Sequence, residues 1–339
     1  ITESAKFGFH ASAKPIIISE VMKSIHQVIA NIAPHDSVER FTGLGATIYQ
    51  GYASFVDNKS VRVNDDIITA KYFVIATGSS PVIPPISGLD KVSYLTNETI
   101  FNLTETPEHL LVIGGGPIGC ELAQAFLMLG IKVTLLNLGK ILPRDEADLV
   151  AELRQNMLNQ GLNLFEDIKI LRIGYNDTQQ IEIVVEVNGR EQIINGSHLL
   201  LATGRKANID KLNLAAANVE QTPHKITVDE RLRTSNKKIF AIGDVAGDYQ
   251  FTHIAGYHAG IVIRNIIFRQ RAKVNYQAVP WVTYTYPELA HVGLLEREAQ
   301  AQYPHDMLVS EFEYKRNDRA QAERELLGKI KLITTKKGK

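Results

Sequence analysis

Residues 109–146 read HLLVIGGGPIGCELAQAFLMLGIKVTLLNLGKILPRDE, and no other run in the chain is as informative about its fold. An apolar strand end at 111–113 leads into a glycine-rich turn, helix-forming residues follow at 121–129, and a second apolar strand covers 132–138. Strand, turn, helix and strand in this order form a βαβ unit. The run therefore predicts an α/β fold in which this unit is one building block.

The turn contains Gly114, Gly116 and Gly119 in G-x-G-x-x-G spacing. In a dinucleotide-binding loop the first glycine makes the tight turn, the second lets the backbone approach a pyrophosphate, and the third lets the helix pack against the strand. The helix N-terminus adds unpaired N–H groups and a partial positive charge. The glycines alone also fit a purely structural turn, but the flanking βαβ pattern favours dinucleotide binding.

The end of the second strand is the position that normally selects between NAD and NADP. An acidic residue about 20 positions after the glycines binds the ribose 2′-hydroxyl of NAD, whereas a nearby arginine suits the 2′-phosphate of NADP. This chain has Asn137 there, which can hydrogen-bond a hydroxyl without repelling a phosphate, and Lys140 and Arg144 follow just downstream. These two cations fit a solvated surface equally well, so the sequence leaves the choice between NAD and NADP open.

Three further strands end in small or acidic residues that suit a ligand. Residues 72–78 (YFVIATG) and 198–204 (HLLLATG) end in Ala-Thr-Gly, and residues 234–244 (TSNKKIFAIGD) end in Gly-Asp. Ligands bind beyond the carboxyl ends of parallel strands, where small residues leave room. An aspartate there can bind sugar or ribityl hydroxyls, and the simpler alternative is a turn aspartate bonded to its own backbone. The candidate cofactor contacts are Thr77, Gly78, Thr203, Gly204, Gly243 and Asp244.

Taken in order, these motifs resemble those of the pyridine nucleotide-disulfide oxidoreductase family, in the branch of mercuric reductase and dihydrolipoamide dehydrogenase. The matching pieces are ATGSSP at 76–81, GGGPIGCELA at 114–123, ATGR at 202–205, TSNKKIFAIGD at 234–244 and TYPELAHVG at 285–293. Together they span most of the chain, so the resemblance extends beyond a single nucleotide-binding unit.

The resemblance implies FAD and NAD or NADP as cofactors, with hydride transfer between the nucleotide and a small-molecule substrate through the flavin. It places Asp244 on the ribityl chain of FAD and Thr77 and Gly78 near the FAD nucleotide. It makes 253–260, which includes Ala255, a helix start facing the flavin, and it puts Glu121 near the nicotinamide. It also implies a homodimer for the intact protein.

Two parts of the family pattern are not found in this sequence. The family begins with a glycine motif for the FAD pyrophosphate and a C-x4-C redox pair, and it closes with a His-Glu pair. We interpret the chain as an internal fragment, rather than a naturally minimised relative, that on its own holds FAD poorly and lacks disulfide reductase activity. The catalytic residues are therefore unknown, because the only cysteine, Cys120, fits buried packing better than a redox role.

Composition narrows the function classes. The 339 residues include 37 basic and 37 acidic side chains, a balance that gives no electrostatic footprint for nucleic acid. No apolar run approaches the ~18 residues of a membrane-spanning helix. A single cysteine suits a reducing compartment and hence a cytoplasmic location. His253 and His258 stand close in sequence but lack an evident third ligand, so we expect no metal site.

The fold class that we expect is α/β, with two interleaved Rossmann-like nucleotide-binding domains followed by the start of an α+β dimerisation domain. We assign 1–105 and 231–279 to the FAD domain, 106–230 to the NAD(P) domain and 280–339 to the dimerisation domain. Local patterns predict helices near 19–33, 147–160 and 295–302, short strands such as 46–50, and a hairpin turning at Asn188-Gly189.

Two classes of function remain open at this level. The first is an FAD-dependent NAD(P)H oxidoreductase of the disulfide reductase type, in which a cysteine pair takes electrons from the flavin. The second is a non-catalytic flavin- and nucleotide-binding sensor, or a flavin-only NAD(P)H oxidase. The sequence does not distinguish among dihydrolipoamide, mercuric ion and other disulfides as substrates.

Overall fold

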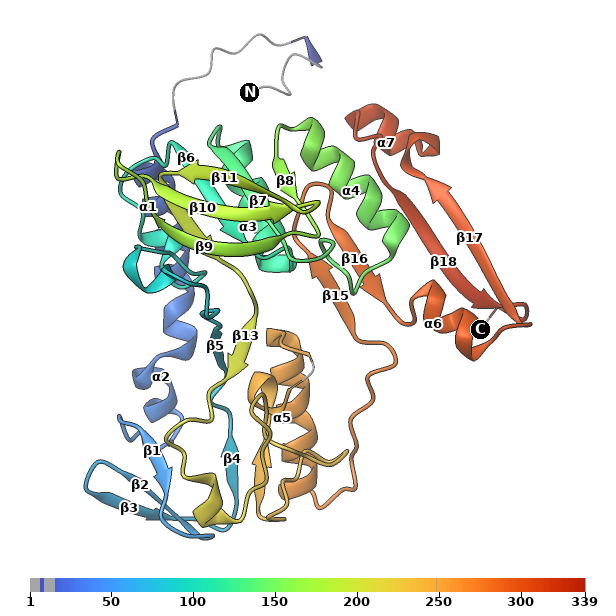
Figure 1. Cartoon of the computed structure of the whole chain (residues 1–339). Helices are drawn as coiled ribbons and strands as arrows, with labels where there is room; N and C mark the ends of the chain where they lie inside the picture. The colour runs from blue at the N-terminus through green and yellow to red at the C-terminus, as the bar shows by residue number, and fades with distance from the viewer. Residues whose placement is uncertain (1–6, 9–15, 248, 339) are drawn as a thin grey trace. The chain divides into compact units, whose positions relative to one another are not determined.

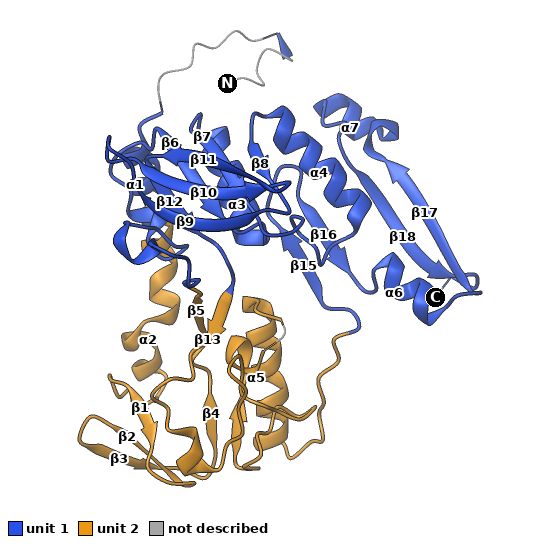
Figure 2. Cartoon of the chain, viewed as in Figure 1, with its two compact units in different colours: residues 1–27, 83–204, 277–339 blue, residues 28–82, 205–276 orange. Residues whose placement is uncertain are grey.

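The computed structural model describes residues 7–8, 16–247 and 249–338, which form two compact units (Figures 1 and 2). Unit 1 comprises residues 1–27, 83–204 and 277–339, and unit 2 comprises residues 28–82 and 205–276. Each unit is built from segments that are far apart in the sequence. The chain passes from unit 1 to unit 2 within helix α1 (Ile18–Ile32).

Unit 1 is centred on a four-stranded parallel sheet with the strand order β12-β6-β7-β8. The strands are β6 (His109–Ile113), β7 (Lys132–Leu136), β8 (Asn163–Phe165) and β12 (His198–Leu201). Strand β6 is apolar throughout its last four residues because both faces of the sheet are covered. Leu110 and Val112 belong to one hydrophobic core, and Leu111 and Ile113 belong to another.

Two different layers cover these faces. Helices α3 (Pro117–Met128) and α4 (Ala147–Asn159) supply Phe126 and Met157 to the first core. The antiparallel sheet β11-β10-β9 supplies Ile183 to the second core. Its strands are β9 (Lys169–Tyr175), β10 (Ile181–Val187) and β11 (Arg190–Gly196), which Figure 1 shows beside the parallel sheet. Strands β10 and β11 are joined at Asn188-Gly189, as predicted, and both turn residues have positive φ, as a two-residue hairpin requires.

The last part of unit 1 contains two hairpins and two short helices. The strands are β15 (Pro280–Thr283), β16 (Leu289–Val292), β17 (Met307–Glu313) and β18 (Lys329–Thr335), paired antiparallel as β15-β16 and β17-β18. The helices are α6 (Glu296–Gln302) and α7 (Asp318–Glu323), with the 3-10 turn η7 (Tyr314–Arg316). Two further 3-10 turns of unit 1 are η3 (Leu89–Lys91) and η4 (Ile100–Asn102).

Unit 2 contains a short parallel pair of strands with antiparallel ribbons. Strand β4 (Phe73–Ile75) pairs parallel with β14 (Ile239–Ala241), and β5 (Ser79–Pro81) pairs antiparallel with β13 (Arg205–Ala207). The remaining elements are β1 (Ala53–Phe55), β2 (Ser60–Val63), β3 (Asp66–Thr69), α2 (Val38–Gly43), α5 (Thr252–Ile266), η2 (Ala33–Asp36), η5 (Leu214–Ala217) and η6 (Gly243–Ala246).

The α/β class and the predicted helices are confirmed, but one predicted strand is wrong. Residues 46–50 have no regular secondary structure and are exposed along their whole length. Alternating apolar residues such as Ile48 favour a strand only when one face can be buried, and here no neighbouring strand of the described structure pairs with them.

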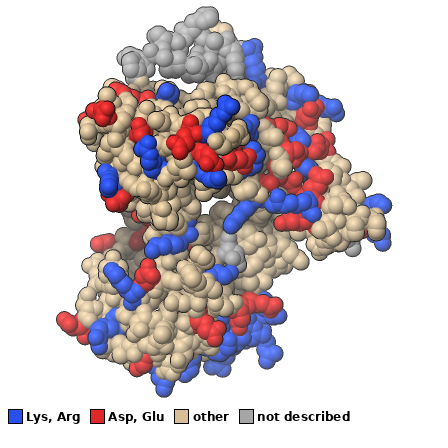
Figure 3. All heavy atoms as spheres, in the orientation of Figure 1, with Lys and Arg blue, Asp and Glu red and all other residues tan. Residues whose placement is uncertain are grey.

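Two surface properties complete the description. On the visible face of unit 1, Figure 3 shows Lys and Arg side chains interspersed with Asp and Glu side chains. Within the described ranges, no helix is both long enough and apolar enough to cross a membrane.

Candidate functional site

The glycine loop of unit 1 has a separate reason for each of two glycines. Gly114 directly follows β6 and has φ of 116°, and a Cβ there would overlap the carbonyl oxygen of Ala202. A Cβ on Gly119 would overlap the carbonyl oxygen of Gly114. Both substitutions would push α3 away from the sheet, because the obstructing atoms are backbone. Gly114 and Gly119 are therefore needed for the fold itself.

Gly116 is different, because nothing in the described part of the structure requires a glycine there. A Cβ on Gly116 would meet no protein atom within 4 Å, and its φ of −78° is accessible to any residue. Gly116 is the N-cap of α3, and no side chain caps the helix. The first N–H groups of α3 thus lie beside open space, which is the arrangement that binds a phosphate.

The strand end at 202–204 lies against the same loop. A Cβ on Gly114 would come within 3.0 Å of the backbone nitrogen of Thr203, so the Ala-Thr-Gly turn and the glycine loop are in contact. Gly204 has φ of 122° and open space where its Cβ would be. The structure thus brings Thr203 and Gly204 together with the glycine loop at the carboxyl edge of the parallel sheet.

Glu121 and Gln124 of α3 hold the segment that follows β15. The Oε1 atom of Glu121 accepts a hydrogen bond from the backbone N–H of Tyr284 at 2.8 Å. The buried amide of Gln124 makes two hydrogen bonds to the backbone of Tyr286, accepting from N–H at 2.6 Å and donating to the carbonyl at 2.8 Å. Burial raises the pKa of Glu121, and the Tyr284 N–H partly opposes this shift. The sequence motifs did not single out Gln124, although it lies one helical turn after Cys120 on the same buried face.

Asn137 directly follows β7, as predicted, but its side chain is bonded to the protein. Its Oδ1 accepts from the backbone N–H of Gly115 at 2.9 Å, and its Nδ2 donates to the carbonyls of Gly139 at 3.0 Å and Lys140 at 2.9 Å. The ammonium group of Lys140 forms an ion pair with Asp167 at 2.6 Å.

The other downstream cation has no such partner. Arg144 is exposed, and its side chain makes no hydrogen bond or ion pair with the described residues. Of the two cations that the sequence offered for a 2′-phosphate, Arg144 is therefore the one not already paired with a carboxylate.

Cys120 is buried in the first turn of α3, and its Sγ donates to the carbonyl of Gly115 at 3.5 Å. Burial, with smaller effects of Glu121 and Asp145, raises its pKa to about 12. The thiol is thus protonated at neutral pH and unreactive as a nucleophile. This environment supports the packing role that the sequence indicated.

In unit 2, the strand end at Thr77 and Gly78 is tied to the segment after β13. Thr77 donates its hydroxyl to the carbonyl of Asn208 at 2.7 Å, and the Asn208 amide donates to the carbonyl of Thr77 at 3.0 Å. The N–H of Asn208 donates to the carbonyl of Gly78, whose φ of 68° makes the turn. A Cβ on Gly78 would meet open space. Asn208 was not found from the sequence, since it lies outside every motif.

Asp244 accepts a hydrogen bond from the hydroxyl of Ser79 at 2.5 Å through Oδ2. Arg205 donates to the same hydroxyl at 2.7 Å, and its Nε lies 3.9 Å from Oδ2 of Asp244. The Oδ1 atom of Asp244 makes no hydrogen bond within the described part of the chain. Asp244 is therefore held by its neighbours with one oxygen left to accept a hydroxyl. Ser79 and Arg205 were in the motifs ATGSSP and ATGR, which could have identified them.

Gly243 and Ala255 are in contact, and His258 holds Gly243 by a hydrogen bond. A Cβ on Gly243 would lie 3.1 Å from the Cβ of Ala255, and φ of Gly243 is 66°. The N–H of Gly243 donates to Nδ1 of His258 at 3.1 Å, so Nε2 carries the proton of the neutral ring and donates to the hydroxyl of Tyr276 at 2.8 Å. His258 is buried, and its ring is held by these two hydrogen bonds.

Protonation of His258 is expected to destabilise the protein at acidic pH. Burial lowers the pKa of His258 below its ordinary value of 6.5, and protonation would remove the acceptor for Gly243 N–H. The unfolded state then binds more protons, so stability is full above about pH 6.5 and falls as the pH drops toward the folded pKa, by at most about 1.4 kcal/mol per pH unit for one proton. Urea unfolding between neutral and mildly acidic pH measures this slope.

The control for this prediction is His258→Gln, which retains an acceptor but does not titrate. The pKa values of His109 and His198 are also lowered by burial, so part of the slope persists in the variant. An identical pH slope in the wild type and His258→Gln would contradict the assignment.

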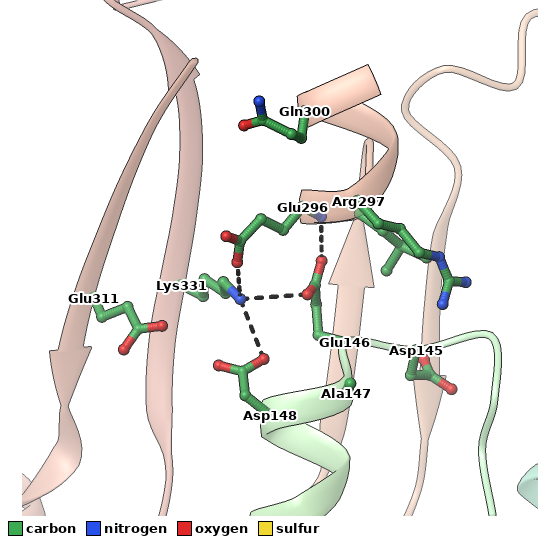
Figure 4. Close-up of a pocket in the computed structure, with 10 residues that line it drawn as sticks. Asp145, Glu146, Ala147, Asp148, Glu296, Arg297, Gln300, Glu311 and Lys331 are labelled. Carbon is green, nitrogen blue, oxygen red and sulfur yellow. Dashed lines mark hydrogen bonds and ion pairs between the residues drawn. The ribbon is translucent and has the colours of Figure 1, made fainter. Parts of the chain in front are cut away.

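A separate cluster of charges connects α4, α6 and the last hairpin of unit 1 (Figure 4). Figure 4 shows the ammonium group of Lys331 pointing between three carboxylates. Its Nζ lies 3.3 Å from Oε2 of Glu146 and 3.1 Å from Oδ1 of Asp148, and it also contacts Oε2 of Glu296. Burial lowers the pKa of Lys331, but these carboxylates raise it by more, so the net pKa lies above the ordinary value. We call these four residues the Lys331 cluster.

Asp145, which precedes Glu146 of the Lys331 cluster, connects this cluster to β15. Its Oδ1 accepts from the indole N–H of Trp281 at 2.7 Å, and burial raises its pKa despite this hydrogen bond. The ring centroids of Trp281 and His291 lie 4.1 Å apart. Trp281 thus makes a specific polar contact with Asp145. In the described ranges, no group of three or more His, Cys, Asp or Glu side chains has a metal-binding arrangement.

The parallel sheet with its glycine loop and the strand-end turns of unit 2 define an α/β protein built for nucleotide cofactors. A model of the pyridine nucleotide-disulphide oxidoreductase family matches residues 8–259, and a model of that family's dimerisation domain matches residues 279–339. The chain therefore belongs to the pyridine nucleotide-disulphide oxidoreductase family.

Similar proteins agree with this assignment. Mercuric reductase of Staphylococcus aureus is 34% identical over 96% of this chain and 60% of its own length. Dihydrolipoyl dehydrogenase of Geobacillus stearothermophilus is 34% identical over 85% of this chain and 62% of its own length. The HOCl-induced flavoprotein disulfide reductase RclA of Escherichia coli superposes with a TM-score of 0.78 at 29% identity, covering 85% of this chain and 66% of that one. The chain thus spans about 60% of the length of such relatives.

Proposed function

We propose that the complete protein is an FAD-dependent NAD(P)H oxidoreductase of the disulfide reductase type. Members of this family use FAD and NAD(P)H. The observation that carries the proposal is the open space at Gly116, where the backbone at the start of α3 can approach a pyrophosphate without obstruction. Open space at an N-cap whose helix has no side-chain cap leaves the first N–H groups available to a phosphate.

The residues of unit 1 provide the nucleotide site of this proposal. The N–H groups at the start of α3 bind the pyrophosphate, and Gly114 and Gly119 keep the helix close enough to present them. Thr203 and Gly204 border the same loop. Glu121, whose carboxylate orders the backbone at Tyr284, is assigned to the nicotinamide end.

The residues of unit 2 provide part of the flavin site. Asp244, with one oxygen fixed by Ser79, accepts hydroxyls of the ribityl chain through the other. The strand-end turns with Thr77, Gly78 and Gly243, together with Ala255 in the first turn of α5, are assigned to the same site. The carboxylate of Asp244 fits a sugar-like chain, because a fixed carboxylate is a strong acceptor for hydroxyls. When bound, the flavin supplies hydride acceptance from the nicotinamide.

Substrate, assembly and location are also proposals. We propose a small-molecule substrate, with dihydrolipoamide, mercuric ion and other disulfides as candidates because relatives of this chain bear the names mercuric reductase and dihydrolipoyl dehydrogenase. The match to a dimerisation domain supports a homodimer. A single cysteine, present as a free thiol, fits a reducing compartment and hence a cytoplasmic location.

The test uses the complete protein, purified and scanned for flavin absorbance. Oxidation of NADH and NADPH is then followed with lipoamide, a disulfide, mercuric ion or oxygen as the acceptor. Turnover with a disulfide or mercuric ion supports the proposal. Turnover with oxygen alone would make the protein a flavin-only oxidase, and bound flavin without turnover would make it a sensor. Absence of both flavin and NAD(P)H oxidation would refute the assignment.

Asp244→Ala is expected to lower the affinity for FAD by roughly tenfold or more, since a charge-assisted hydrogen bond contributes about 1.5–3 kcal/mol. The matched control is Asp210→Ala, which removes an exposed carboxylate of unit 2 that pairs with Lys206. The measurement is flavin retained per protein after dialysis, together with the unfolding midpoint of each apoprotein. Equal flavin retention by Asp244→Ala and Asp210→Ala would rule out the assigned contact.

A further inference from the structure

Asn137 is placed where a nucleotide-selecting residue is expected, but its side chain faces the glycine loop. The carboxamide oxygen accepts from Gly115 N–H, and the amide nitrogen donates to the carbonyls of Gly139 and Lys140. The amide has two hydrogens, so both donors are used. Asn137 therefore has no hydrogen left to offer a ribose hydroxyl or a 2′-phosphate.

Packing ties Asn137 to the loop as closely as these hydrogen bonds do. A Cβ on Gly115 would lie 2.8 Å from Cγ of Asn137 and 2.9 Å from its Nδ2. The side chain of Asn137 thus fills the space beside Gly115 and leaves no room for a larger residue there. The backbone of the next segment is also fixed to the loop, since Leu142 N–H donates to the Gly115 carbonyl at 2.8 Å.

We propose that Asn137 is a positioning residue that holds the glycine loop in its phosphate-binding form, and that it does not select between NADH and NADPH. The proposal rests on the proposed function, because it assumes that the loop binds NAD(P)H. Asn137 joins the loop at Gly115 to the turn at Gly139 and Lys140, so one amide connects the two segments that border the nucleotide.

Asn137→Asp separates positioning from selection. An aspartate that read the ribose would strengthen NADH binding and weaken NADPH binding, because a carboxylate accepts from the 2′-hydroxyl and repels the 2′-phosphate. In this structure the new carboxylate oxygen would instead face two carbonyl oxygens at hydrogen-bonding distance. It would open the turn, so we expect both nucleotides to bind about tenfold more weakly.

The experiment measures the Kd of NADH and NADPH by titration of the complete protein, and KM and kcat for each nucleotide. The variants are Asn137→Asp and Asn137→Ala, with Asn159→Asp as the control because Asn159 is exposed and bonds only Gln155 by its side chain among the described residues. We expect both Kd and KM values to rise about tenfold, their NADH/NADPH ratio to stay within about threefold of the wild type, and kcat and flavin content to be unchanged.

Contrary outcomes are distinguishable. A ratio shifted tenfold or more toward NADH in Asn137→Asp, with NADH binding retained, would overturn the positioning role while leaving the proposed function intact. Loss of flavin together with nucleotide binding would show a general folding role and would also overturn it. A wild-type protein that binds neither nucleotide would refute the proposed function and this inference together.

The contact between Asn137 and Gly115 can also be tested by combining Asn137→Ala with Gly115→Ala. Gly115→Ala places a Cβ against the Asn137 side chain and also 2.8 Å from Cγ2 of Ile141, so the two substitutions share the Asn137 contact. We expect the double variant to bind NADH no more than about threefold more weakly than the weaker single variant, since changes at one contact are not additive. Full multiplication of the two losses would argue against the contact.

Discussion

Gly116→Val is expected to weaken the binding of NADH and NADPH by roughly a hundredfold or more while leaving the protein folded. The added side chain meets no protein atom and the backbone has a φ of −78°, so the unliganded loop accepts the substitution. It fills the space through which the α3 N-terminus approaches a pyrophosphate, and loss of two or more phosphate hydrogen bonds at about 1.5–3 kcal/mol each produces a change of this size. Titration of both nucleotides measures it.

The matched control is Gly174→Val in β9. A Cβ at Gly174 also meets open space, and its φ is not in the left-handed region, but it lies on the outer antiparallel sheet away from the loop. Gly174→Val should bind both nucleotides as the wild type does. The pyrophosphate assignment fails if Gly116→Val binds NADH and NADPH with wild-type affinity. It also fails if Gly116→Val has a much lower unfolding midpoint than the wild type, because unfolding would then explain the loss of binding.

Lys331→Met is expected to destabilise unit 1 by about 3–5 kcal/mol, because removing one partner from a buried ion pair leaves uncompensated charge. The Lys331 side chain is only 7% exposed, and Glu146 is 11% exposed. Without the ammonium group, the carboxylates of the Lys331 cluster repel one another, and Lys329 compensates only Asp148, from whose Oδ2 it lies 2.6 Å. The free energy of unfolding in urea is the measurement.

Lys315→Met is the control for this result. Lys315 pairs with Glu313 at 2.8 Å but is 59% exposed, so its removal should change stability by no more than about 0.5 kcal/mol. Lys331→Arg retains the charge and should recover part of the loss. If Lys331→Met and Lys315→Met proved equally mild, the Lys331 cluster would not contribute to stability as its burial indicates.

The sequence predicted those parts of the site that depend on neighbouring residues. The strand, the glycine turn and the start of α3 lie within a few positions of one another, so their spacing alone indicated the loop. The backbone reasons for Gly114 and Gly119 could also be assigned, because a dinucleotide loop uses each glycine in a fixed way. Gly116 has empty space beside it, unlike Gly114 and Gly119, and that difference is visible only in three dimensions.

Side-chain orientation and distant pairing could not be predicted. Asn137 occupies the predicted position, but the sequence does not show that its amide turns toward Gly115 and two carbonyls. Lys331 and Glu146 are 185 positions apart in the sequence, and each alone resembles an ordinary surface charge. Residues 46–50 show the opposite error, since a strand-like pattern without a partner strand stays irregular.

The Lys331 cluster also bears on how chimeras of this family should be assembled. The matched dimerisation module starts at residue 279, so its junction would be an obvious place to exchange modules between relatives. Here Glu146 and Asp148 from the preceding module supply acids for a lysine in the exchanged one. A chimera that replaces Lys331 without Glu146 and Asp148, or the reverse, would leave a buried charge without its partner at the junction. The acidic segment 145–148 should therefore be exchanged together with the carboxyl-terminal module at 279–339.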